Sequence, residues 1–175
     1  MDRYTYIERI LRQIYGGMPS DDSEITVNLV NNWLNDAIAL AAKQNYKENI
    51  AVDGIGYVNN SFYTTFKGLS VVEDEQFVWK VTLPQLPLGI GHSEGVSTLK
   101  FKSSTGEVSL PCVPLSENQS TYFETMRVVP NKILFKSNGT FLYAKSTLLL
   151  NQYTASVTMV SGGDATDLDS IINVP

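Results

Sequence analysis

The chain has 175 residues, of which 43% are hydrophobic and 18% are charged, and its formal net charge is −5. This composition predicts a folded chain, with a surface that as a whole repels nucleic acid, because nucleic-acid binding depends on cations that neutralise phosphates. A single cysteine, Cys112, excludes an internal disulfide, and together with the single histidine, His92, it supplies too few ligands for a structural zinc.

The first helix is predicted over residues 4–15. Its apolar side chains have the i, i+3, i+4 and i+7 spacing that places them on one helical face. They are Ile7, Ile10, Leu11 and Ile14. Gly16 and Gly17 then tolerate positive φ and predict the end of the helix.

A second helix is predicted from about Asp21 to about Tyr46. Asp21 can accept hydrogen bonds from the free amides, and Glu24, three residues later, completes a capping box. The apolar stripe consists of Val30, Trp33, Leu34, Ala37, Ile38 and Ala41, and the polar far side consists of Asn31, Asn32, Asn35 and Asp36. This helix would be about 38 Å long. The first helix can cover only about half of the stripe, so the rest must pack on the β region or on another copy.

From Ile55 onward, the hydrophobic pattern has a period of two. Strands are predicted at residues 57–66, 69–73, 76–82, 97–102, 107–110, 121–128, 132–136, 140–144 and 153–160. One buried and one solvated face indicate an antiparallel sheet. Asn138-Gly139 favours a two-residue hairpin, and Thr105-Gly106 favours a second turn.

The fold class that follows is α+β. Residues 1–49 form a helical hairpin, residues 50–161 form an antiparallel β domain resembling a sandwich or barrel, and residues 162–175 form a C-terminal tail. Within the β domain, residues 83–96 form a long loop rich in proline and glycine with aliphatic side chains at Leu86, Leu88 and Ile90. Loops of this length are usually functional or mobile.

The search for catalytic and metal-binding residues finds no convincing site. His92 is the only imidazole, Ser93 is merely adjacent to it in sequence, and no Gly-x-Ser-x-Gly motif occurs. The carboxylates cluster at residues 21–24, 73–75 and 164–169 without the pattern of a calcium loop. We therefore expect a non-enzymatic protein with no cofactor and no metal. No run of about 20 apolar residues and no signal core occur, so we expect a protein that is soluble where it is made, with no membrane partner.

Several segments together resemble a structural protein of crAss-like short-tailed bacteriophages. They are residues 6–17 (YIERILRQIYGG), 29–38 (LVNNWLNDAI), 45–46 (NY), 57–66 (YVNNSFYTTF) and 167–175 (DLDSIINVP). The resemblance implies a head-to-tail connector, or adaptor, in which twelve copies form a ring between the portal protein and the next tail or ring protein. It also implies that double-stranded DNA passes through the channel without specific binding. The protein would be made in the cytoplasm of a bacterial host and reside in the virion.

The residues and the resemblance together predict two contact surfaces. Trp33, Leu34, Ala37 and Ile38 are expected against neighbouring helices, although the same stripe could be internal core. Leu86, Leu88 and Ile90 are expected to insert into the partner ring.

Two other functions remain open from sequence. A β-sheet module that binds carbohydrate or a host receptor would need exposed aromatics, and an outward-facing Trp79 would favour it. A hydrolase of cell-wall polymer would need a pair of carboxylates in a cleft.

Overall fold

The computed structural model describes residues 1–17, 24–90, 95–103, 108–115, 119, 121–130, 132–161 and 167–172. The chain divides into a helical unit, Met1–Thr64 with Ser161–Pro175, and a β unit, Thr65–Val160. The predicted boundary at residue 49 is therefore wrong, because it falls inside a helix. The predicted separate tail is wrong as well, because the C-terminal segment belongs to the helical unit.

The first helix, α1, spans Arg3–Tyr15 and confirms the prediction for residues 4–15. Ile7 and Leu11 are buried along one side, as the apolar spacing requires. Gly16 follows with a φ of 65°, a left-handed conformation in which a Cβ would be costly. The glycine therefore ends the helix where the sequence places it.

The second helix, α2, spans Val27–Asp53, so both predicted ends are wrong. Its N-cap is Thr26, whose Oγ1 accepts a hydrogen bond from the Leu29 amide at 3.3 Å. Asp21, the predicted cap, lies outside the described residues. No helix breaker occurs at Tyr46, and the helix continues until Gly54, which has a φ of 71°. At 1.5 Å per residue, α2 is about 40 Å long.

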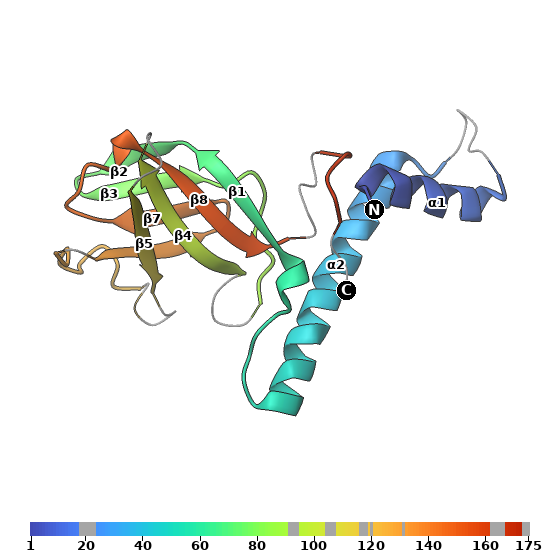
Figure 1. The fold of residues 1–175 in the computed structure, drawn as a ribbon, viewed down its shortest axis with the longest axis horizontal. Helices are drawn as coiled ribbons and strands as arrows, with labels where there is room; N and C mark the ends of the chain where they lie inside the picture. The colour runs from blue at the N-terminus through green and yellow to red at the C-terminus, as the bar shows by residue number, and fades with distance from the viewer. Residues whose placement is uncertain are drawn as a thin grey trace. The chain divides into compact units, whose positions relative to one another are not determined.

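The core of the helical unit joins α1, α2 and the C-terminal segment. Its buried members are Ile7, Leu11 and Val30, and Leu168 packs against them. Figure 1 shows α1 lying across the N-terminal part of α2. The C-terminal segment also accepts hydrogen bonds from the start of α1: the Arg3 amide donates to Ser170 O at 3.0 Å, and the Tyr4 amide donates to Leu168 O at 2.9 Å. These carbonyls therefore accept hydrogen bonds from the first amides of α1, which have no partner within the helix.

Eight strands form one sheet that curls into a half-barrel (Figure 1). The strands are β1 (Tyr63–Leu69), β2 (Val71–Glu75), β3 (Val78–Thr82), β4 (Val96–Ser103), β5 (Ser109–Pro114), β6 (Ile133–Asn138), β7 (Phe141–Lys145) and β8 (Tyr153–Val160). Their order in the sheet is β1-β8-β4-β5-β6-β7-β3-β2. The pairs β2–β3, β3–β7, β4–β5, β4–β8 and β6–β7 are antiparallel, as predicted, but β5 and β6 are parallel. The fold class is α+β, with a mixed sheet.

Two strand predictions differ from the structure: the predicted strand 57–66 begins only at Tyr63, after a 3-10 helix at Asn60–Phe62, and residues 121–128 form no strand. Parallel neighbours need a long crossover connection, and this segment is part of the crossover from β5 to β6. It forms turns in which Tyr122 O accepts hydrogen bonds from the amides of Thr125 and Met126. Phe123 is buried there, so its aromatic character reflects packing of a turn rather than a strand.

The predicted hairpin after β6 is confirmed, with its turn shifted by one residue. Asn138 pairs with Phe141, so the two loop residues are Gly139 and Thr140, and Gly139 has a φ of 60°. The β4–β5 hairpin is present as well, although Thr105-Gly106 lies outside the described residues.

The core of the β unit lies on one face of the sheet. Leu99 and Phe101 are buried while Lys100 and Lys102 are exposed, which confirms the predicted alternation on β4. In the described part of the β unit, fourteen buried residues form this core, including Trp79, Val81, Phe135, Leu142 and Val157. The sheet therefore has one apolar face that is filled by the chain itself.

Candidate functional site

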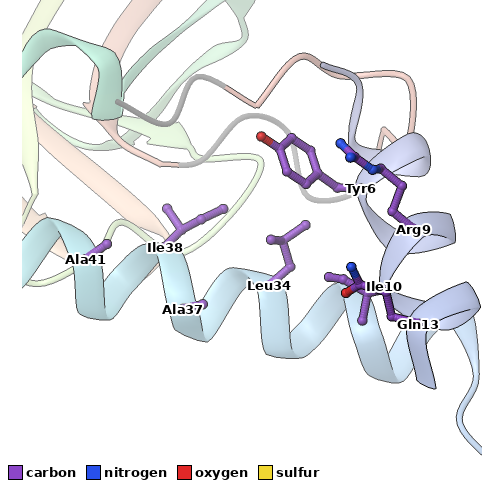
Figure 2. Close-up of a pocket in the computed structure, with 8 residues that line it drawn as sticks. All are labelled: Tyr6, Arg9, Ile10, Gln13, Leu34, Ala37, Ile38 and Ala41. Atoms are coloured by element: carbon purple, nitrogen blue, oxygen red, sulfur yellow. The ribbon is translucent and has the colours of Figure 1, made fainter.

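A groove lies between α1 and α2 within the helical unit and has a volume of about 510 Å³. Each helix contributes one face at the i, i+3, i+4 and i+7 spacing. The lining residues are Tyr6, Arg9, Ile10 and Gln13 of α1 and Leu34, Ala37, Ile38 and Ala41 of α2 (Figure 2). The lining is apolar except for Arg9 and Gln13.

The helices contact each other through Ile7, Leu11 and Val30, and part of the groove beside this contact is lined by small residues of α2. Ala37 and Ala41 each offer only a methyl group to the space between the helices. Figure 2 shows Leu34 and Ile38 projecting from α2 toward Tyr6 of α1. A site of this volume is in the range that buries a group of about drug size, so large side chains could enter it.

A second apolar surface lies on α2, outside the groove lining except for one shared residue. It consists of Leu29, Trp33, Ala37 and Leu40, and we call it the α2 ridge. At about 100° per residue, these four positions fall within about 80° of arc. Trp33 is 47% exposed and Leu40 is 67% exposed. The ridge is therefore a continuous apolar line that the chain does not cover.

The predicted helix interface divides between these two surfaces. Trp33 and Ala37 are exposed, Leu34 is half-buried, and Ile38 is only 5% exposed. Ile38 exposes little surface of its own and contributes to the wall of the groove, so a neighbour could reach it only by entering the groove. Sequence reasoning missed Leu29 and Leu40, although their positions four residues before and seven residues after Trp33 could have identified them.

The predicted partner-ring contact is only partly available. Leu86 is exposed and Leu88 is half-buried, but Ile90 is 4% exposed, so its insertion into a partner is a wrong prediction. The reason is that the loop folds back on the end of β8. The Leu88 amide donates to Val160 O, and the Val160 amide donates to Gly95 O at 2.7 Å.

Arg3 holds α1 against α2 at the end of the groove. Its guanidinium is fully buried, and Nη1 donates to Asn31 Oδ1 and to Asn35 Oδ1, each at 2.7 Å. Asn31 and Asn35 are one turn apart on α2, so a single cation bridges both. The prediction that these asparagines lie on the polar far side of the helix is wrong. A buried arginine was not expected there from sequence.

Three lysines of the sheet, Lys80, Lys136 and Lys145, alternate with core residues along their strands. Each contacts an aromatic ring or a backbone carbonyl of the same chain. Lys80 Nζ lies 4.3 Å from the centre of the Phe141 ring, and Lys136 Nζ lies 4.7 Å from that of Phe123. Lys145 Nζ donates to Phe123 O at 2.9 Å. These cations are held over rings and carbonyls rather than arranged as a stripe that would follow a phosphate backbone.

The candidate reactive and metal-binding groups do not gather in the described part of the chain. His92 lies outside it, and burial raises the pKa of the Cys112 thiol to about 12, so little of the reactive thiolate form is present near neutral pH. No group of three or more His, Cys, Asp or Glu side chains among the described residues could hold a metal ion. Asp74, in the acidic run at residues 73–75, lies 3.7 Å from Lys80 Nζ.

Trp79 is buried in the core of the β unit. An outward-facing Trp79 is the feature that would have favoured a carbohydrate- or receptor-binding module, and the structure does not provide it.

None of the helices described is both long enough and apolar enough to cross a membrane. No protein-family model matches the chain, and no curated protein matches its sequence. A function must therefore be inferred from the residues of the chain itself, and the groove and the α2 ridge are the surfaces that suggest one.

Proposed function

We propose that the chain is a structural virion protein, one subunit of a head-to-tail connector ring that joins the portal to the tail and lines the DNA exit channel. The observation that carries the proposal is the α2 ridge. A surface helix of a monomer usually has one apolar face directed at the core. In α2, Val30, Ile38 and Ala42 are buried, yet Trp33 and Leu40 on another side remain exposed. A second apolar face favours a helix that is completed by a neighbour.

The size of the ridge argues for a closed ring rather than a pair. Burying the exposed parts of Leu29, Trp33 and Leu40 would contribute on the order of 5 kcal/mol per contact. Association costs about 4–15 kcal/mol in lost freedom of motion, so one such contact supports only a weak dimer. A ring gives every subunit two contacts, and closure adds one contact without a further subunit to immobilise. We therefore expect cooperative assembly, with the twelve copies that the sequence resemblance implies.

The other expected partners follow from charge and from the β unit. The net charge of −5 disfavours adhesion of DNA to a channel wall, so duplex DNA would pass without specific binding. The exposed Leu86 is the remaining candidate for contact with the portal or with the next tail or ring protein.

Light scattering after gel filtration, over a dilution series, tests the proposal. The purified chain, alone or mixed with the portal ring of its virion, should form a closed oligomer that electron microscopy shows as a ring. Trp33→Gln should lower the ring population. Val52→Gln should not, because Val52 is 82% exposed on the same helix but lies off the ridge.

A chain that stays monomeric alone and fails to bind the portal ring would contradict the connector proposal. A trimer that binds neither portal nor tail would contradict it as well. Retention of duplex DNA at about 0.15 M salt would contradict the expected passage without binding.

A further inference from the structure

We infer that the α2 ridge of one copy inserts into the groove between α1 and α2 of the next copy. This inference rests on the proposed ring function and specifies the contact that would build the ring. The two surfaces are complementary in kind, since one is a convex line of large apolar side chains and the other is an open apolar groove of about 510 Å³.

The ridge of a copy does not fill its own groove. Trp33 and Leu40 are not among the groove residues, and both remain exposed. Ala37 belongs to both surfaces and marks the border between them. Among the described residues the ridge therefore leaves the groove of its own copy open, and the ridge of a second copy has the chemistry to enter it.

Charge complementarity favours the second copy as the occupant. Arg9 lines the groove and is exposed. Asp36 is exposed beside the ridge, three residues after Trp33 and four before Leu40. Within the described residues, neither Arg9 nor Asp36 takes part in an ion pair. A ridge seated in the groove would bring its aspartate toward the arginine of the neighbour, and such rim charges set the register of an interface more than its strength.

The contact is heterologous, because ridge and groove are different surfaces of the same subunit. Contacts of this kind repeat head to tail and close into a ring when the rotation divides the circle. A two-fold contact of ridge against ridge would instead stop at a dimer and leave the groove empty.

Two variants separate these arrangements. Trp33→Gln weakens the ridge and leaves the groove intact, whereas Ala41→Leu fills the groove and leaves the ridge intact. Each variant alone should lose the ring in light scattering. At high protein concentration, which a single weak contact requires, an equimolar mixture should form a one-to-one heterodimer and nothing larger, because only one combination of ridge and groove remains functional. Circular dichroism of each variant is the control and should show an unchanged helical signal.

A charge exchange provides a test that does not depend on the apolar residues. Arg9→Glu and Asp36→Arg each place like charges together and should weaken assembly on the order of tenfold. The double variant should recover most of the wild-type assembly, because the pair is restored in reverse.

The outcomes distinguish this inference from the ring proposal itself. If the wild type forms rings and Ala41→Leu forms them equally well, the ridge-in-groove contact is wrong and the connector proposal stands. A mixture of the two variants without heterodimer, or a charge exchange without recovery, also overturns the contact. If the wild type assembles neither alone nor on the portal ring, both proposals fail.

Discussion

Replacing the buried Arg3 should separate α1 from α2 and destabilise the helical unit. The Arg3 side chain donates from one nitrogen to Asn31 and Asn35, both at 2.7 Å. Arg3→Met keeps most of the apolar stem and removes the charge and its donors. The substitution therefore isolates the polar contribution with little change in packing volume.

The expected loss is about 3 kcal/mol. Hydrogen bonds from a charged donor contribute about 1.5–3 kcal/mol each, so the two bonds that Arg3 donates to Asn31 and Asn35 contribute about 3–6 kcal/mol together. Asn31 and Asn35 are only half-buried, so water can partly replace the arginine, and the lower end of that range applies. With a urea dependence of about 1.5 kcal/mol per molar, the unfolding midpoint should fall by about 2 M.

Far-ultraviolet circular dichroism during urea unfolding measures the loss, since α1 and α2 dominate the helical signal. Arg12→Met is the matched control, because Arg12 lies on the same helix in an exposed ion pair with Glu8. That control should change stability by less than about 0.5 kcal/mol. Equal midpoints for the two variants would refute the conclusion that Arg3 holds the helices together.

Three further substitutions or reactions test other parts of the structure. Gly95→Ala should lower the free energy of unfolding by about 3 kcal/mol, because φ is 78° and the new Cβ would overlap the Leu88 carbonyl oxygen, whereas Gly139→Ala, at a φ of 60° in open space, should lose only about 1 kcal/mol in the same urea assay. Phe77→Gly should raise the free energy of unfolding by about 0.5–1 kcal/mol, because Phe77 has a φ of 66° and an exposed ring. Iodoacetamide should alkylate Cys112 near pH 9 at least about tenfold more slowly in the folded chain than in urea, because burial raises the thiol pKa to about 12.

Each of these expectations has a result that would contradict it. Equal losses for Gly95→Ala and Gly139→Ala would refute the overlap with Leu88, and a destabilised Phe77→Gly would show that the Phe77 ring stabilises its turn. Equal alkylation rates would show that the thiol is not shielded.

The raised pKa of the Cys112 thiol also determines how the stability of the chain depends on pH. The unfolded chain loses this proton near pH 9 and the folded chain near pH 12, so stability should fall as pH rises across that window.

The helices show what the sequence can and cannot determine. The bounds of α1 were predictable because its apolar stripe and the glycine that follows it indicate the same helix. The start of α2 was not, because Asp21 and Thr26 are both good capping residues. Contacts from distant residues favour Thr26: the Ile25 amide donates to Tyr15 Oη at 2.8 Å, and Val27 packs on the helical core.

The sheet shows the same limit at residues 121–128. Tyr122 and Phe123 have the composition of a strand, and local periodicity cannot distinguish a strand from an aromatic turn. In the turn, the carbonyls of Phe123 and Glu124 accept hydrogen bonds from Lys145, which lies 22 residues from Phe123, so a distant residue contributes to the conformation. The parallel pairing of β5 and β6 likewise arises only when the crossover has folded.

The candidate site was half predictable for a related reason. A single stripe from Val30 to Ala41 assumes that α2 has one apolar face, so Leu29 and Leu40 were left among polar neighbours. The structure divides that stripe: Val30 and Ile38 are buried in the chain, and Trp33 remains exposed. Because Arg3 draws Asn31 and Asn35 inward, part of the inner face of α2 is polar, and apolar residues are left on the outside. The same hydrogen bonds that close the helical unit therefore accompany the exposure of the α2 ridge.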